Sequence, residues 1–295
     1  MNRFVRLALG ASLLVGAAGC GRDSDAAPPA SEAPASPSRI ISLSPTATEV
    51  LFAIDAGDQV IAIDDQSNYP PEALEKQHDL ASYEPSVEAI AALDPDLVVI
   101  AYDTKDLSGQ LRKLGIDVWV GTPPATFDDV YQQITDLGAA TGHAAEAASL
   151  VTEMQADIAA AVEGIQAPET APSYYLELDP TLYSATSNTF AGEVFGLFGL
   201  DNIADEAEAG NDYPQLSAEY IVAADPQLIF LADGLCCDQT PEAVAARAGW
   251  ETILAVKSGD VIAIDDDIAS RWGPRLVDYV RLVAGAVSGL STPTG

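Results

Sequence analysis

Histidine is scarce in this chain, and the motifs that usually carry enzyme chemistry are missing. The 295 residues contain two histidines, His78 and His143. The sequence has no Walker A loop, no Gly-x-Ser-x-Gly elbow, no His-Glu-x-x-His motif and no Cys-x-x-Cys pair. A hydrolase needs a general base beside a nucleophile, and this chain offers few candidates for that base. The sequence therefore predicts a protein that is not an enzyme, with no catalytic residue and no cofactor.

Basic side chains are also few. The sequence has 13 lysines and arginines against 45 aspartates and glutamates, which gives a formal net charge of -32. Binding to nucleic acid needs a basic face, and adsorption on anionic lipid needs a basic patch. The composition therefore predicts no nucleic-acid partner, and most of the acidic side chains are expected to form a solvated surface.

Cysteine occurs three times, and the two cysteines of the folded region are adjacent in the sequence. Cys236 and Cys237 have no histidine or further cysteine nearby, so they do not make a zinc site. Free thiols and a vicinal disulfide both stay open. Acidic pairs such as Asp64-Asp65 could imitate a metal site, but adjacent residues on a strand point to opposite faces. We expect them to be solvated turn ends, and we predict no metal site.

The N-terminal residues have the pattern of a bacterial lipoprotein signal. Two arginines precede the apolar run 7–15, which is too short to span a bilayer as a mature helix. Small residues then lead directly into Cys20, as in a lipobox, where the cysteine becomes the lipidated first residue. The alternative is an ordinary secretory signal with an incidental cysteine. We predict a cleaved signal at 1–19, a flexible linker at 20–38 and a protein anchored outside the cytoplasm through Cys20.

One pattern of sixteen residues occurs twice, at 86–101 and at 217–232, with a constant offset. Each copy begins with a serine, Ser86 or Ser217, that can cap the N-terminus of a short helix. An Asp-Pro pair then ends the helix, because the residue before proline disfavours the α region. The apolar run that follows does not alternate, which is typical of a strand covered on both faces of a parallel sheet. The repeat predicts two similar lobes.

Strands and helices alternate along both halves of the predicted fold, which favours largely parallel sheets. Between the two copies lies the longest helical pattern, 143–165, with an apolar stripe of Val151, Met154, Ile158 and Val162. We therefore predict an α/β protein with two similar lobes, each built on a central, mostly parallel sheet, joined by one long rigid α-helix. The expected boundaries are an N-terminal lobe at 39–138, a connecting helix at 139–167 and a C-terminal lobe at 168–295.

Several segments in this order resemble the class III periplasmic binding proteins. These are Arg-Ile-Ile-Ser-Leu-Ser-Pro-Thr-Ala-Thr-Glu at 39–49, Asn-Tyr-Pro-Pro at 68–71, the repeat, the long helix, and the stretch from Asp267 to Arg275. The resemblance covers roughly residues 39–288. Members of this family serve ABC importers of vitamin B12, iron–siderophores and haem. The resemblance implies a monomeric protein that captures a metal chelate and delivers it to a dimeric ABC permease.

The resemblance also implies a role for Glu88 and Glu219, the glutamates of the two repeat copies. In the family, glutamates at these positions dock into arginine pockets on the two permease subunits, where carboxylate–arginine pairs fix orientation. The alternative is that each glutamate only complements the dipole of its helix.

Aromatic side chains near strand and helix ends are the predicted walls of the ligand cleft, since such loops line the crevice of open α/β sheets. By resemblance, Arg271 meets an anionic part of the ligand. The ligand is expected to be a ferric siderophore or cobalamin, with haem as the alternative. Gln66 replaces a ring that stacks on the corrin in vitamin B12 importers. A surface sensor or scaffold without a small ligand is a further alternative. The predicted ligand residues are Tyr83, Tyr102, Tyr183, Tyr213, Asp267, Arg271 and Trp272.

Overall fold

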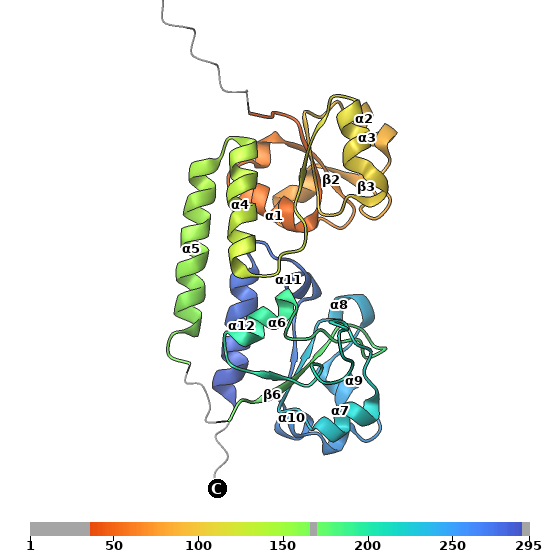
Figure 1. Ribbon diagram of the computed structural model, residues 1–295, viewed down its shortest axis with the longest axis vertical. Coiled ribbons are helices and arrows are strands. Elements are labelled where there is room, and N and C mark those ends of the chain that lie inside the picture. The colour runs from red at the N-terminus through yellow and green to blue at the C-terminus, as the bar shows by residue number, and fades with distance from the viewer. Residues whose placement is uncertain (1–35, 166–169, 291–295) are drawn as a thin grey trace, which may run out of the picture. The chain divides into compact units, whose positions relative to one another are not determined.

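Two parallel sheets form the framework of the protein, and each copy of the repeat supplies one central strand and the helix before it (Figure 1). The computed structural model describes residues 36–165 and 170–290, which belong to one compact unit. The predicted signal at 1–19, Cys20 and most of the predicted linker lie outside the described residues.

The first sheet has the order β3-β2-β1-β4-β5, and the second has the order β7-β6-β8-β9. Every pairing within them is parallel. The repeat strands β4 and β8 are buried along their whole length, as their unbroken apolar runs predict. The strands are β1 Ile40–Leu43, β2 Val60–Asp64, β3 Gln77–Leu80, β4 Leu97–Ile100, β5 Asp117–Val120, β6 Ser173–Glu177, β7 Asp201–Asn202, β8 Leu228–Leu231 and β9 Val261–Ala263.

Helices connect the strands and cover the sheets. No helix among residues 36–165 and 170–290 is both long and apolar enough to cross a membrane. The helices are α1 Pro45–Ala53, α2 Val87–Ala92, α3 Leu107–Lys113, α4 Phe127–Thr141, α5 Ala144–Val162, α6 Phe190–Gly196, α7 Ala218–Ala224, α8 Gly234–Cys237, α9 Pro241–Ala245, α10 Leu254–Ser258, α11 Asp266–Ser270 and α12 Leu276–Gly289.

Both repeat helices begin as predicted but end differently. The Ser86 hydroxyl accepts a hydrogen bond from the Ala89 amide at 3.2 Å, and the Ser217 hydroxyl accepts one from the Tyr220 amide at 3.1 Å. At the other end, Asp94 and Asp225 have φ angles of 49° and 47°. The residue before each proline is therefore left-handed rather than extended. Aspartate tolerates this conformation better than most residues, so both helices still stop at the predicted place.

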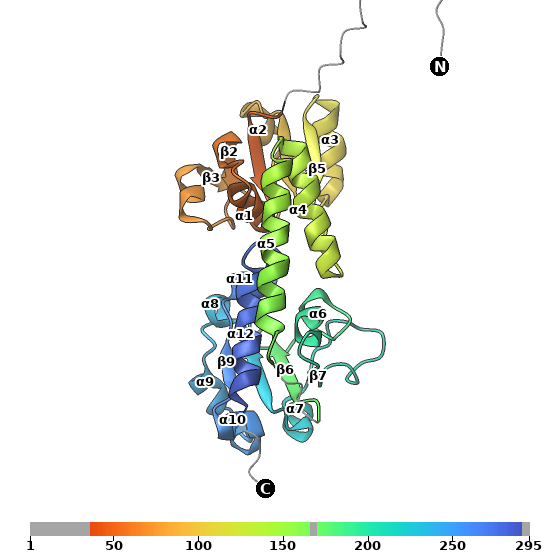
Figure 2. The same ribbon diagram turned by 90° about the vertical axis from the view of Figure 1, so that its left-hand side faces the viewer.

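The long helix α5 confirms the connector that its apolar stripe predicts. It spans 19 residues, which corresponds to about 28 Å of helix. Met154 and Ile158 are buried, while Val151 and Val162 are half-buried. The stripe packs against α4 and α12, which lie along α5 in both views (Figures 1 and 2). One hydrophobic cluster includes side chains from α5 and from both sheets, so the core is continuous across the two lobes.

Some elements were not predicted from the sequence. Strand β3 reads Gln-His-Asp-Leu, and its first three residues are exposed, so it lacks an apolar signal. Strand β7 has two residues and α8 has four, which is too short for a periodic pattern. Helix α4 ends at Thr141, three residues beyond the predicted boundary of the N-terminal lobe at 138. Gly142 stops it with a φ of 85°, a left-handed conformation that favours glycine.

Candidate functional site

A cavity of about 370 Å³ lies at the carboxyl ends of strands β1, β2 and β4, the edge where open parallel sheets bind ligands. Five of the seven predicted ligand residues line it: Tyr83, Tyr102, Asp267, Arg271 and Trp272. Gln66 also lines it, at the position where the resemblance to vitamin B12 importers leads us to expect a stacking ring.

Two tyrosines extend from the loops of the first lobe beside this cavity. The side chain of Tyr83 is 79% exposed and that of Tyr102 is 63% exposed. Both residues line the same cavity, which distinguishes them from aromatic residues scattered singly over a surface. The two rings therefore offer wide contact area with little rotamer freedom to lose on binding.

The other two predicted tyrosines, Tyr183 and Tyr213, belong to the second lobe and do not line the cavity. Their two loops pair with each other, because Tyr183 forms an antiparallel bridge with Gln215, two residues after Tyr213. Burial raises the pKa of Tyr213, and the neighbouring Asp212 and Tyr102 raise it further. Tyr213 is 56% exposed, and the effect of Tyr102 on its pKa indicates that these two side chains of different lobes lie in the same region.

Arg271 is the centre of a polar network that joins the two lobes. Its Nη1 donates to Glu49 Oε1 at 3.1 Å and to Asn68 Oδ1 at 2.8 Å. Its Nη2 donates to the Gln66 carbonyl at 3.1 Å and to Asp267 Oδ1 at 2.5 Å. Four of the five guanidinium N–H groups are thus used within the protein. A ligand anion at Arg271 would compete with acceptors that are already in place, and this role stays a prediction.

Glu49 was not predicted from the sequence as a site residue, yet it binds two arginines. It is buried on α1, and besides Arg271 it accepts from Arg275 Nε at 3.0 Å and Arg275 Nη2 at 2.6 Å. The guanidinium of Arg275 also lies 4.4 Å from the centre of the Tyr69 ring. With Asp267, the network contains two carboxylates and two guanidinium groups, so its formal charges balance. The bidentate Glu49–Arg275 pair fixes orientation as well as charge.

Hydrogen bonds to the buried Asp64 hold the loop that contains Gln66 and Asn68. Asp64 Oδ1 accepts hydrogen bonds from the Gln66 amide at 2.9 Å and the Ser67 amide at 2.7 Å. Burial raises the pKa of Asp64, which is fully buried at the end of β2. The expectation that the Asp64-Asp65 pair is solvated is therefore wrong for Asp64 and right for Asp65, whose side chain is exposed.

Trp272, the residue after Arg271, lies against side chains of the first lobe. It lines the cavity and also a small apolar pocket with Trp119 and Val130. Gly273 follows, and a Cβ there would lie 3.3 Å from Glu49 Oε2, so a side chain would crowd the network. The segment from Arg271 to Arg275 thus joins the lobes through side-chain contacts, in addition to the chain connection through α5.

The two repeat glutamates lie away from this cavity. Glu88 and Glu219 occupy the first turns of α2 and α7, and both side chains are exposed. The Ser86 hydroxyl also donates to Glu88 Oε2 at 3.1 Å. Both carboxylates are therefore accessible to a partner, as docking requires, and the same positions also suit the helix dipole.

No cluster of three or more histidine, cysteine, aspartate or glutamate side chains suited to a metal ion occurs among the residues that the structure describes. The arginine and tyrosine side chains that line the cavity can contact a ligand through hydrogen bonds and aromatic surface.

Comparison with known proteins agrees with this geometry. A family model described as "Periplasmic binding protein" matches residues 40–268. An ABC transporter substrate-binding lipoprotein of Bacillus subtilis, YvrC, is 30% identical over 85% of this chain and 80% of its own length. A vitamin B12-binding protein of Pectobacterium carotovorum is 30% identical over 86% of this chain and 90% of its own. The haem-binding protein RhuT of Roseiflexus, solved in its apo form, superposes with a TM-score of 0.74 at 25% identity and covers 84% of this chain and 97% of its own.

Proposed function

This chain belongs to the periplasmic binding protein family, and we propose that it captures a metal chelate, a ferric siderophore or cobalamin, and delivers it to an ABC importer. The family consists of binding proteins for transport substrates, so the chain is not an enzyme. The observation that carries the proposal is the cavity of about 370 Å³ at the strand ends, where exposed tyrosines meet a charge-balanced arginine network.

The cavity chemistry suits a chelate in two ways. The rings of Tyr83 and Tyr102 line the cavity and give broad contact to a flat or rounded ligand. Asp267 and Arg271 line the cavity, and Asn68 is hydrogen-bonded to both, so the rim carries a carboxylate and a guanidinium group in fixed positions. The similarity to a vitamin B12-binding protein supports cobalamin, whereas Gln66 in place of a stacking ring supports a different chelate.

Haem is the second candidate. RhuT, with a TM-score of 0.74, is a haem-binding protein by name. A tyrosine oxygen can ligate haem iron, and both Tyr83 and Tyr102 are exposed at the cavity. An axial tyrosine would give a characteristic absorption spectrum, which the siderophore and cobalamin alternatives do not produce.

Delivery to the permease is proposed to use Glu88 and Glu219, one from each lobe. Both are exposed at the starts of equivalent helices, so a permease dimer with an arginine pocket on each subunit would engage both at once. The expected working form is a monomer between two permease subunits.

Reversal of both charges tests the docking role. The double variant Glu88→Arg/Glu219→Arg should lose uptake of the ligand in cells while its affinity for the ligand stays unchanged, because neither side chain lines the cavity. The matched control is Glu146→Arg/Glu153→Arg on α5, which reverses the same number of exposed acids. Normal uptake by the docking variant, or equal loss by the control, would contradict the role.

Anchoring at Cys20 and the two lobes at 39–138 and 168–295 complete the proposal, with α5, Ala144–Val162, as the helical part of the predicted connector at 139–167. The relative YvrC is named a lipoprotein, and it supports the prediction that the signal at 1–19 ends before a lipidated cysteine. Mass spectrometry of the mature N-terminus decides the point: a diacylated or triacylated Cys20 is expected, and a free N-terminus at another residue would contradict it.

Binding itself is tested by titration of the purified protein with cyanocobalamin, haemin and ferric ferrioxamine, followed by absorption and tryptophan fluorescence. We expect one-to-one binding of at least one of them. Tyr83→Ala should weaken it by roughly tenfold, as expected for loss of a stacked ring. Tyr83→Phe, which keeps the ring, is the matched control and should bind nearly as the parent does. A folded protein that binds none of the three would overturn the ligand assignment and leave the scaffold alternative.

A further inference from the structure

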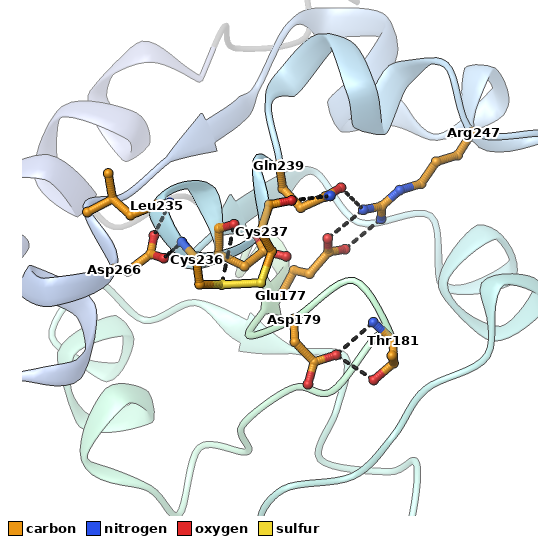
Figure 3. The surroundings of a disulfide bond; sticks show 10 residues. Glu177, Asp179, Thr181, Leu235, Cys236, Cys237, Gln239, Arg247 and Asp266 are labelled. Carbon is orange, nitrogen blue, oxygen red and sulfur yellow. Dashed lines mark hydrogen bonds and ion pairs between the residues drawn. A yellow bond between two sulfur atoms is a disulfide. The ribbon is translucent and has the colours of Figure 1, made fainter. Parts of the chain in front are cut away.

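A disulfide joins the adjacent residues Cys236 and Cys237 in α8, the short helix that follows β8 (Figure 3). The sequence leaves free thiols and a vicinal disulfide equally open, and the structure has the disulfide. Cys236 is exposed and Cys237 is half-buried. A small thiol reagent can therefore reach the sulfur atoms without unfolding of the protein.

The N-terminal side of α8 contacts the element that carries the ligand network. The Leu235 amide donates to Asp266 Oδ1 at 3.1 Å, and the Cys236 amide donates to Asp266 Oδ2 at 2.8 Å. Asp266 is the first residue of α11, and the next residue, Asp267, binds Arg271. The amides of α8 thus bind Asp266, which is the sequence neighbour of Asp267 at the polar rim of the cavity.

The C-terminal side of α8 contacts a buried charged cluster. Gln239 Nε2 donates to the Cys237 carbonyl at 3.0 Å, and Gln239 Oε1 accepts from Arg247 Nη2 at 2.8 Å. Arg247 forms a bidentate pair with the fully buried Glu177, at 2.6 and 2.5 Å (Figure 3). Burial and the charge of Glu177 raise the pKa of Asp233, just before α8, to about 7. Both ends of α8 are therefore fixed by side chains of other elements.

The disulfide supplies local order that α8 otherwise lacks. A helix of four residues is unstable by itself, because nucleation fixes several dihedrals for one hydrogen bond. Asp238 then ends it with a φ of 54°. A covalent link between neighbouring side chains restricts the turn, and this same turn aims two amides at Asp266.

We propose that Cys236–Cys237 is a thiol-exchange site, at which a small dithiol opens the disulfide and loosens the contact of α8 with Asp266 beside the ligand cavity. The reaction balances as ordinary exchange: the protein S–S bond breaks, two cysteine thiols form, and the dithiol gives two electrons and two protons as it closes to its own disulfide. Asp238 follows the pair in the sequence and Asp266 accepts hydrogen bonds from the Leu235 and Cys236 amides, so the negative charge near the pair favours a neutral reductant over an anionic one.

Amide hydrogen exchange of the folded, full-length mature chain tests the proposal without any ligand. Dithiothreitol, followed by iodoacetamide, should add two carbamidomethyl groups to a protein that stays folded by circular dichroism. The amides of Leu235 and Cys236 should then exchange roughly tenfold faster, which corresponds to about 1.4 kcal/mol, while the amides of β8 keep their rate. Failure to reduce the pair without denaturant, or unchanged exchange after reduction, would overturn the proposal.

Three variants separate the disulfide from its acidic contact. Cys236→Ser/Cys237→Ser should show the fast exchange with or without dithiothreitol. Asp266→Asn should speed the same amides while the disulfide stays intact. The matched control, Asp238→Asn, removes one exposed acid from the same turn and should exchange like the parent chain. Slow exchange in the double serine variant would contradict the assigned role of the disulfide.

The effect on ligand affinity rests on the proposed function. If oxidised protein binds cyanocobalamin, haemin or ferric ferrioxamine, reduction should weaken that binding several-fold, because Asp267 follows Asp266 on α11 and binds Arg271, the residue at the end of that helix. Equal affinity in both redox states would contradict the link to the cavity. If none of the three binds, the proposed ligand class fails, and the amide exchange still decides whether the thiol-exchange site exists.

Discussion

Replacement of Glu49 by glutamine should destabilise the protein and loosen the connection between its lobes. Glu49 is 2% exposed and accepts three hydrogen bonds from two arginines. Glu49→Gln keeps the shape of the side chain but removes its charge and turns one acceptor into a donor that faces guanidinium groups. Arg271 and Arg275 would then share a buried region with one carboxylate fewer.

The size of the effect follows from the contacts that are left. Removal of one partner of a buried ion pair typically costs about 3–5 kcal/mol. Asp267 still binds Arg271 at 2.5 Å, and Arg275 still lies over Tyr69, so we expect the lower end of that range. A loss of about 3 kcal/mol corresponds to a fall in Tm of roughly 6–12 °C for a protein of this size. Typical stabilities of about 5–15 kcal/mol leave the variant folded.

Urea and thermal unfolding measure this loss. The matched control is Asp157→Asn, which breaks an exposed pair with Arg281 whose side chains are 53% and 52% exposed. Exposed pairs contribute about 0–1 kcal/mol, so the control should lie close to the parent. If Glu49→Gln changes stability by no more than Asp157→Asn does, the reasoning about the buried network is wrong.

Three further predictions concern other sites. Asp233 has a folded-state pKa of about 7, above its unfolded value, so the stability that its protonated form gives below pH 4 is lost as pH rises through about 7. Between about pH 4 and pH 7 the urea midpoint of Asp233→Asn should therefore fall less than that of the parent protein. Equal falls in the two proteins would contradict this. Asp94 is left-handed, so Asp94→Ala should cost about 1–2 kcal/mol in urea unfolding while Asp94→Gly costs little, and equal costs would refute the backbone argument. Gly273→Ala should lower both the Tm and ligand affinity, since the added Cβ meets Glu49 and the Thr46 carbonyl at 3.3 and 3.4 Å, whereas Gly196→Ala, with open space around it, should change neither.

The two-lobed fold could be predicted because its signals are local or repeated. The repeat at 86–101 and 217–232 predicts the same short helix, Asp-Pro helix end and buried strand twice. The sequence of α5 contains an apolar stripe at helical spacing. Short elements were missed because neither β3 nor α8 contains enough residues for a period. Their existence depends on neighbours that are distant in the sequence, such as the pairing of β3 with β2.

The site was predicted less completely than the fold. Tyr83, Tyr102 and Arg271 were chosen from the sequence because their chemistry stands out in an acidic chain, and all three line the cavity, while their contact with a ligand stays a prediction. Glu49 was missed because one acid among 45 carries no signal until the fold brings it to two arginines. Asp266 carries no sequence signal either, yet its carboxylate accepts hydrogen bonds from two amides of α8. Pairings across 200 residues of sequence cannot be inferred from spacing alone.

The absorption spectrum of the protein purified from the cells that make it tests the central claim most directly. A binding protein for a chelate retains part of its ligand through gentle purification when dissociation is slow. We predict a co-purified band of a ferric siderophore, a corrin or haem, present in stoichiometric proportion and diminished in Tyr83→Ala. A colourless protein that also takes up none of the three added chelates would contradict the account.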